Sequence, residues 1–433
     1  MENLLLVALG FIAVFILLFL GIPIAFGMGI VGVVGFAILV GLDPALSMVA
    51  QLTFANVYDY SYAVLPLFLL MGNFIARSGM SQHLYDASYA YLGHRRGGLA
   101  MATIAACAGF AAVCGSSVAT AATMANVAMP SMRRYGYADS LATGTIAAGG
   151  TLGILIPPSV IMVIYGLMTE TDIAKLFMAG VLPGILGAVL YIVAILIQVQ
   201  ARPALGPAGE RSSWRTRLAT TKGVWGVFVL FVLVIGGIYT GLFTPTEAGG
   251  VGAAGAFLFA LSRRALTVRI VLDVLAETAR TAAAMFVLLI GALMFSNYLE
   301  VSGFPALMLN WIKSLEVAPI VVILVIMAIY VVLGCILESL SMMLLTVPIF
   351  FPIISSLGYD PVWFGILIVV VIEISLITPP IGLNVFMLKA MMPEVPVTTI
   401  FRGVMPFIAA DIVRLAIVVF APAFVLFLPA NMG

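Results

Sequence analysis

The stretch ISLITPPIGLNVF, residues 374–386, places two consecutive prolines and a glycine inside a very hydrophobic run. Nearly the same pattern occurs earlier, as LGILIPPSVIMVI at residues 152–164. Proline lacks a backbone N–H group and disfavours helical geometry in the residue that precedes it. Each stretch therefore predicts a helix that is interrupted in the middle of an apolar segment.

The composition around these two stretches is typical of a membrane protein. The chain has 433 residues, of which 64% are hydrophobic and 9% are charged, whereas about a quarter of the residues of a water-soluble domain are charged. Because backbone polar groups must pair within the chain in lipid, the long apolar runs predict helices. We therefore expect an all-α polytopic membrane protein that contacts the lipid bilayer. The net charge of +1 gives no sign of nucleic-acid binding.

The second half of the chain resembles the first when it is shifted by 222 positions. The matched residues are mainly those that interrupt or turn a backbone, which indicates an internal structural repeat. The matches at this single offset are Pro157 and Pro158 with Pro379 and Pro380, Pro130 with Pro352, Ser117 with Ser339, Pro23 with Pro245, and Gly27 with Gly249; with a shift of two further positions, Asn73 matches Asn297.

A polar loop at residues 201–223 divides the chain into two repeats, 1–200 and 224–433. Lys313 alone flanks the segment of the second repeat that corresponds to an arginine-flanked segment in the first. Since positive residues favour the cytoplasmic side, the two repeats are predicted to have opposite orientations in the membrane, as in many transporters. The arginines of the first segment are Arg77, Arg95, Arg96, Arg133 and Arg134.

Each repeat contains a segment that is predicted to enter the membrane and return on the same side. In the first repeat this hairpin covers residues 98–133, with CGSSVATAA at its centre, and in the second it covers residues 318–356. Glycine and serine are natural turn and cap residues. Non-helical backbone at this depth is tolerated only where it is buried in protein or lines a cavity, so we expect both tips near a binding site.

The interrupted helices predict the chemistry of that site. Unpaired carbonyl groups near the two proline pairs, together with the hydroxyl groups of the hairpin tips, would suit a hard cation such as Na⁺. The amino ends of the half-helices would favour an anionic ligand. A pair of broken helices at matching positions is the strongest pointer to a midplane site that a sequence offers.

Several other polar residues have more than one interpretation. Glu338 and Glu373 are acids at membrane depth, so each could carry a proton or could pair with backbone donors. Asp411 and Arg414 lie three positions apart on the last predicted helix and are expected to neutralise each other. The motif TPTEA at residues 244–248 predicts a capped helix start.

The motifs GSSVATAATMANVAMPSM, LFMAGVLPG, TPTEA, LTVPIFFPI, GYDPVWFG and ITPPIGLN resemble those of the large membrane subunit of tripartite ATP-independent periplasmic (TRAP) transporters. They extend from Gly115 to Asn384, and the length fits a whole subunit. The resemblance departs at Glu338, where an aspartate is expected in many relatives; the charge is kept but the side chain is longer, which leaves its role open.

The resemblance implies a function and a set of partners. The fold would be an inverted-repeat elevator, in which a transport domain with two hairpins moves against a scaffold domain in the bacterial inner membrane. A small four-helix membrane subunit and a periplasmic substrate-binding protein would be separate chains. Transport would be driven by sodium ions, and the cargo would be an organic acid such as a dicarboxylate or sialic acid. The chain would not be an enzyme.

The resemblance also implies site residues. One sodium site would use Ser116 and Ser117 with Gly153, Ile156 and Pro158. The second sodium site would use Ser339, Ser341, Thr378 and Gly382. Cargo would lie between the two tips, bound by Ser117, Thr120, Glu338, Ser339 and Asn384.

Three other functions remain as alternatives. A stand-alone sodium-coupled anion carrier of related fold would need no binding protein. An ion channel can also use discontinuous hairpins, but no filter motif is present and the repeat lies within one chain. A membrane enzyme would need a nucleophile with its base, or metal ligands, at membrane depth; Cys107, Cys114 and Cys335 lie in apolar surroundings without metal-ligand spacing.

Overall fold

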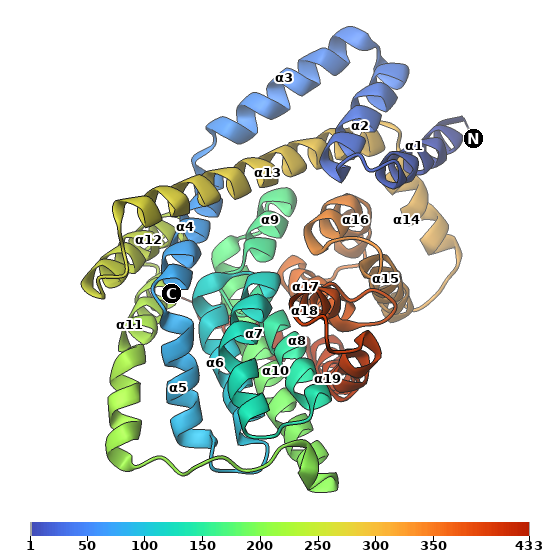
Figure 1. Cartoon of the computed structure of the whole chain (residues 1–433). Helices are drawn as coiled ribbons and strands as arrows, with labels where there is room; N and C mark the ends of the chain where they lie inside the picture. The colour runs from blue at the N-terminus through green and yellow to red at the C-terminus, as the bar shows by residue number, and fades with distance from the viewer. Residues whose placement is uncertain (1, 433) are drawn as a thin grey trace.

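The computed structural model describes residues 2–432, and over this range the chain forms helices and no strands (Figure 1). The all-α prediction is confirmed. The N-terminal helices lie beside the long helix α13 at one end of the molecule. Their bounds are α1 Glu2–Phe19, α2 Ile24–Val40 and α3 Leu42–Tyr58, and α13 is Val268–Val301.

Helices α2 and α13 pack through glycines. An added Cβ atom on Gly32 would lie 2.6 Å from the backbone of Met294, and one on Gly35 would lie 2.5 Å from the ring of Tyr298. Small residues allow two helix backbones to approach closely in a membrane protein. The glycine-rich stretch at residues 29–36 is therefore a packing surface.

The rest of the first repeat begins with a short 3₁₀ turn and ends with a long helix. Its hairpin is formed by α6 and α7, and its broken helix by α8 and α9. The elements are η1 Tyr60–Ala63, α4 Val64–Arg77, α5 Met80–Leu92, α6 Gly98–Cys114, α7 Ser117–Arg134, α8 Asp139–Thr151, η2 Leu152–Ile154, α9 Val160–Thr169 and α10 Ile173–Ala201.

In the second repeat, a hairpin, a broken helix and a long helix follow one another in the same order as in the first. Helices α7 and α16 begin 222 positions apart, at Ser117 and Ser339, and both proline pairs contain a cis peptide bond. The further elements are η3 Pro203–Leu205, α11 Trp214–Tyr239, α12 Pro245–Ser262, α14 Phe304–Ser314, α15 Pro319–Gly334, α16 Ser339–Ser356, α17 Pro361–Ile377, α18 Leu383–Met391, α19 Val397–Phe420, α20 Pro422–Leu426 and η4 Pro429–Asn431.

The polar loop between the repeats is shorter than the predicted 201–223. Helix α11 already begins at Trp214, because the Ser213 hydroxyl accepts a hydrogen bond from the Thr216 amide at 3.1 Å and caps the helix. Arg217, in the first turns of α11, is buried and donates to the Ala90 carbonyl of α5 at 3.0 Å. The polar residues at 214–223 are therefore a helical extension and not a linker.

Helices α3, α5 and α14 do not correspond to any long apolar run of the sequence. Each carries polar residues along part of its length, so a search for unbroken hydrophobic segments misses it.

By contrast, the capped start of α12 is confirmed. The Thr244 amide donates to Glu247 Oε2 at 2.9 Å, and the Glu247 amide donates to the Thr244 hydroxyl at 3.3 Å.

Within residues 2–432, six helical segments are long and apolar enough to cross a membrane, and six shorter helices are also apolar. Many large hydrophobic side chains on α1–α3, α11 and α13 are exposed, as expected of surfaces that face lipid or a partner subunit. The six long segments are Tyr60–Arg77, Ile173–Ala201, Trp214–Tyr239, Val268–Val301, Ser339–Ser356 and Val397–Phe420.

Candidate functional site

Both predicted helix breaks are present in the structure. In the first repeat, α8 ends at Thr151, and α9 begins at Val160 with the Ser159 hydroxyl as its cap. In the second repeat, α17 ends at Ile377, and α18 begins at Leu383 after Gly382, which has a φ of +61°. The first break is buried along its whole length, whereas residues 379–381 of the second break are exposed.

The tip of the first hairpin packs directly on the first break. An added Cβ atom on Gly153 would lie 2.5 Å from the Ser116 carbonyl oxygen, and one on Gly115 would lie 2.9 Å from the Pro158 carbonyl oxygen. The Thr120 hydroxyl donates to the Ser116 carbonyl at 2.7 Å. The glycines therefore permit an approach between backbone segments that no side chain would allow.

The tip of the second hairpin lies beside the second break. The Cys335 thiol is 3.5 Å from the Pro379 carbonyl oxygen. Glu338 caps α16, since its Oε2 atom accepts from the amides of Leu340 and Ser341, each at 3.2 Å. The acid at membrane depth thus pairs with backbone donors, which is one of the two roles considered for it.

A chamber of about 410 Å³, lined by polar and apolar side chains, lies between the two tips and the helices α4 and α13. Four of the predicted site residues line it: Ser116, Ser117, Glu338 and Ser339. Because both tips and the amino ends of α7 and α16 meet here, the tips bring hydroxyl groups, the Glu338 carboxylate and two positive helix ends to the chamber.

Sequence reasoning missed the far wall of this chamber, which comes from α4 and α13. Asn73, Glu277 and Thr281 lie there; the Asn73 amide donates to Thr278 at 2.9 Å, and Glu277 pairs with Arg77 at 3.2 Å. The sequence feature that could have pointed to this wall was the match of Asn73 to Asn297 in the repeat. The polar residues of α13 carried no motif.

The other predicted site residues do not line the chamber. Thr120 is fully buried, and Ser341 lines a neighbouring, mostly apolar pocket of about 750 Å³ together with Glu338. The Thr378 hydroxyl donates to the Ile374 carbonyl at 2.6 Å. The residues in the breaks themselves are Gly153, Ile156 and Pro158 in the first and Thr378 and Gly382 in the second.

Asn384, for which the sequence predicted contact with cargo, does not line the chamber. Its side chain is fully buried and donates to the Ser117 hydroxyl at 2.9 Å and to the Ala147 carbonyl at 3.1 Å. A buried amide needs such partners because its desolvation is costly. Asn384 therefore joins the second broken helix to the first hairpin tip, and Met162, its counterpart in the repeat, makes no such link.

We expect the Asn384→Ala variant to be destabilised by roughly 1–3 kcal/mol, because Ser117 and Ala147 lose a buried partner. The matched control is Asn297→Ala, since the half-buried Asn297 donates only to Leu293 of its own helix. Thermal inactivation of the two purified variants would measure the difference. Equal lifetimes would show that the Asn384 contacts contribute nothing to stability.

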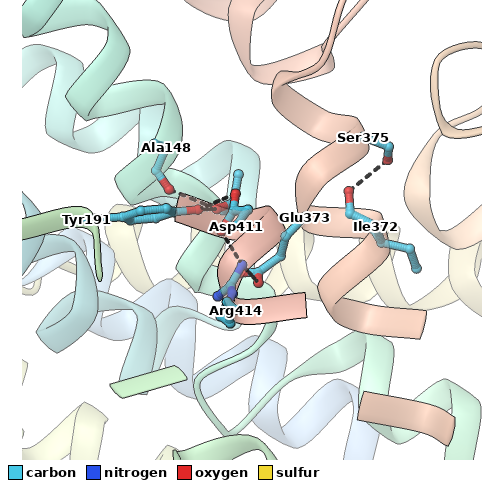
Figure 2. Close-up of polar contacts among 8 residues, drawn as sticks. Ala148, Tyr191, Ile372, Glu373, Ser375, Asp411 and Arg414 are labelled. Carbon is cyan, nitrogen blue, oxygen red and sulfur yellow. Dashed lines mark hydrogen bonds and ion pairs between the residues drawn. The ribbon is translucent and has the colours of Figure 1, made fainter. Parts of the chain in front are cut away.

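A second polar group lies deeper in the protein, among α8, α10, α17 and α19 (Figure 2). Arg414 contacts Asp411 at 2.7 Å, as the sequence predicted, but it also contacts Glu373 at 2.6 Å. The Tyr191 hydroxyl donates to Asp411 at 2.8 Å. All of these side chains are at most 1% exposed, so Glu373 does not face the chamber.

The model of the family described as "Tripartite ATP-independent periplasmic transporter, DctM component" matches residues 11–424. The chain belongs to the DctM family of TRAP transporters. It is thus the large permease component of a tripartite system, a multi-pass protein of the bacterial inner membrane. Its relatives are permeases, so the prediction that it is not an enzyme is confirmed.

The relatives of this DctM protein differ in what their names say they transport. It is 38% identical to a C4-dicarboxylate TRAP transporter large permease of Pseudomonas aeruginosa, over 90% of this chain and 91% of that protein. It is 34% identical to an ectoine/5-hydroxyectoine large permease of Ruegeria pomeroyi (96% and 97%). It is 31% identical to a sialic acid large permease of Vibrio cholerae (95% and 96%).

A solved structure confirms the fold class. The YdaH transporter of Alcanivorax borkumensis superposes with a TM-score of 0.63 and 15% sequence identity, over 88% of each chain. At that identity the likeness concerns the fold alone.

Proposed function

We propose that this DctM protein carries out sodium-coupled uptake of an organic acid that a periplasmic binding protein delivers. The observation that carries the proposal is the chamber at which two hairpin tips and two broken helices converge. Discontinuous helices of this kind bind cations through unwound carbonyl groups and anionic groups through half-helix amino ends. The C4-dicarboxylate and sialic acid relatives support an acidic cargo.

The proposed first sodium site consists of Ser116 and Ser117 with the backbone of Gly153, Ile156 and Pro158. It is supported by the close packing of Gly153 and Gly115 on the opposite segments. Hard cations prefer such oxygen ligands. The proposed second site consists of Ser339, Ser341, Thr378 and Gly382.

In the proposed mechanism, α6–α10 and α15–α19 form a transport domain, and the helices that include α4 and α13 belong to the scaffold. Cation binding organises each tip on its broken helix and compensates charge, so that an anionic cargo can enter a low-dielectric site. The loaded domain then moves across the membrane as an elevator. The two repeats, which are joined by a cytoplasmic loop that ends before α11, are proposed to have opposite orientations, as the arginine distribution predicts.

The test is reconstitution of this chain in liposomes with the small four-helix subunit that we expect as its partner. Uptake of a labelled acid is measured with an inward sodium gradient, with and without the binding protein. We expect uptake only when both are present. Uptake without the binding protein would instead support a stand-alone sodium-coupled anion carrier, and uptake without the gradient would contradict sodium coupling.

Single Ser117→Ala and Thr378→Ala variants test the two sodium sites separately. We expect each to raise the sodium concentration for half-maximal uptake by about 3- to 10-fold, since a lost polar contact contributes roughly 0.5–1.5 kcal/mol. The control is Ser356→Ala, because the Ser356 hydroxyl bonds only to Ile353 at the far end of α16. Unchanged sodium dependence in both test variants would contradict the site assignments.

A further inference from the structure

The second, deeper polar group is a continuous series of polar contacts between buried side chains (Figure 2). The Thr151 hydroxyl lies 3.2 Å from the Tyr191 hydroxyl, which donates to Asp411 Oδ2 at 2.8 Å. Arg414 Nη2 lies 2.7 Å from Asp411 Oδ1 and 2.6 Å from Glu373 Oε2. This series of polar contacts therefore connects α8 and α10 of the first repeat to α17 and α19 of the second.

The residues at the two ends of this series of contacts, Thr151 and Glu373, occupy equivalent positions in the repeat. Thr151 precedes Pro157 by the same number of residues as Glu373 precedes Pro379. Each end thus lies on the helix that leads directly into a break. The contacts through Tyr191, Asp411 and Arg414 therefore link the two broken helices.

The charges in this group do not balance when both acids are ionised. Glu373 and Asp411 would carry two negative charges, while Arg414 is the only cation within 4 Å of either in the described chain. All three side chains are at most 1% exposed. An uncompensated charge at such a depth is strongly unfavourable, and a buried carboxyl group avoids it by keeping its proton.

The contacts distinguish the two acids. Asp411 accepts hydrogen bonds from both Tyr191 and Arg414, so its ionised form is stabilised. Glu373 Oε1 has no protein hydrogen-bond partner, and its other oxygen contacts only the Arg414 nitrogen that Asp411 already uses. The remaining guanidinium nitrogens, Nε and Nη1, face no acceptor. Arg414 is therefore shared between the acids rather than paired fully with each.

We propose that Glu373 is a proton-binding site that holds its proton at neutral pH, so that the link between the two broken helices is electrically neutral. The transport domain then crosses the membrane without a net charge from this group. The net charge that crosses the membrane is then the charge of the cargo and the coupling cations alone. This inference does not depend on which cargo or cation the chamber binds.

Infrared spectroscopy of the purified full chain in lipid nanodiscs tests the site without any transport assay. A protonated carboxyl group has a C=O stretching band that ionised carboxylates lack. We expect the wild-type protein to show such a band at neutral pH, and Glu373→Gln to lose it. Glu338→Gln is the control and should retain it.

A measurement on the wild-type chain covers the case in which Glu373→Gln does not fold. Labelling of glutamate side chains with ¹³C should shift the band, whereas labelling of aspartate should leave it in place. Absence of the band at neutral pH would overturn the proposal. So would a band that shifts with labelled aspartate, or one that persists in Glu373→Gln.

Discussion

Replacement of Arg414 by methionine is expected to destabilise the protein strongly. Methionine fills much of the same space but leaves Asp411 buried with Tyr191 as its only polar partner. Removal of one member of a buried ion pair costs about 3–5 kcal/mol. Thermal inactivation of the purified full chain should show a lifetime shortened by at least an order of magnitude.

An exposed ion pair of the same protein provides the control. Arg77 pairs with Glu277 at 3.2 Å, but both side chains are 51% exposed, and such pairs contribute only about 0–1 kcal/mol. Arg77→Met should therefore leave the lifetime nearly unchanged. The Asp411→Asn/Arg414→Met double variant should recover much of the loss, because it removes the unpaired charge. No recovery would show that packing by Arg414, rather than charge, is what matters.

The features predicted from sequence are those encoded by local chemistry. Two proline pairs at one offset indicated both breaks, and serines beside a glycine indicated the first hairpin tip. These residues act on the backbone of their own segment, so their effect can be read without knowledge of neighbouring helices. The start of α16 at Ser339 followed from the same repeat.

The features that were missed depend on which helix faces meet. Asp411 and Arg414 lie on one helix, so their pairing was predictable, but Glu373 comes from α17 and its approach depends on packing. The resemblance assigned Asn384 to the cargo, whereas in the structure its side chain contacts Ser117. Uniformly apolar helices give no periodic signal for the buried face, and so the orientation of such residues could not be derived.

The largest expected effect on transport comes from adding one methyl group at Gly153. A Cβ atom there would lie 2.5 Å from the Ser116 carbonyl oxygen and 2.8 Å from the Thr120 hydroxyl. Backbone cannot move aside as a flexible side chain can, so the hairpin tip must withdraw from the break, at a cost of about 1–3 kcal/mol. A binding site tolerates displacements of only about 0.5 Å, and we expect Gly153→Ala to reduce sodium-driven uptake more than tenfold.

Gly250→Ala is the matched control, because no atom lies within 4 Å of an added Cβ on Gly250 in α12. It should transport as the wild type does, and it should be slightly more stable, since alanine favours a helix over glycine. Uptake in liposomes and thermal lifetime are measured for both variants. If Gly153→Ala kept its lifetime but lost uptake, the defect would lie in the contact between tip and break. Wild-type uptake in Gly153→Ala would show that close packing of the tip on the break is not needed for transport.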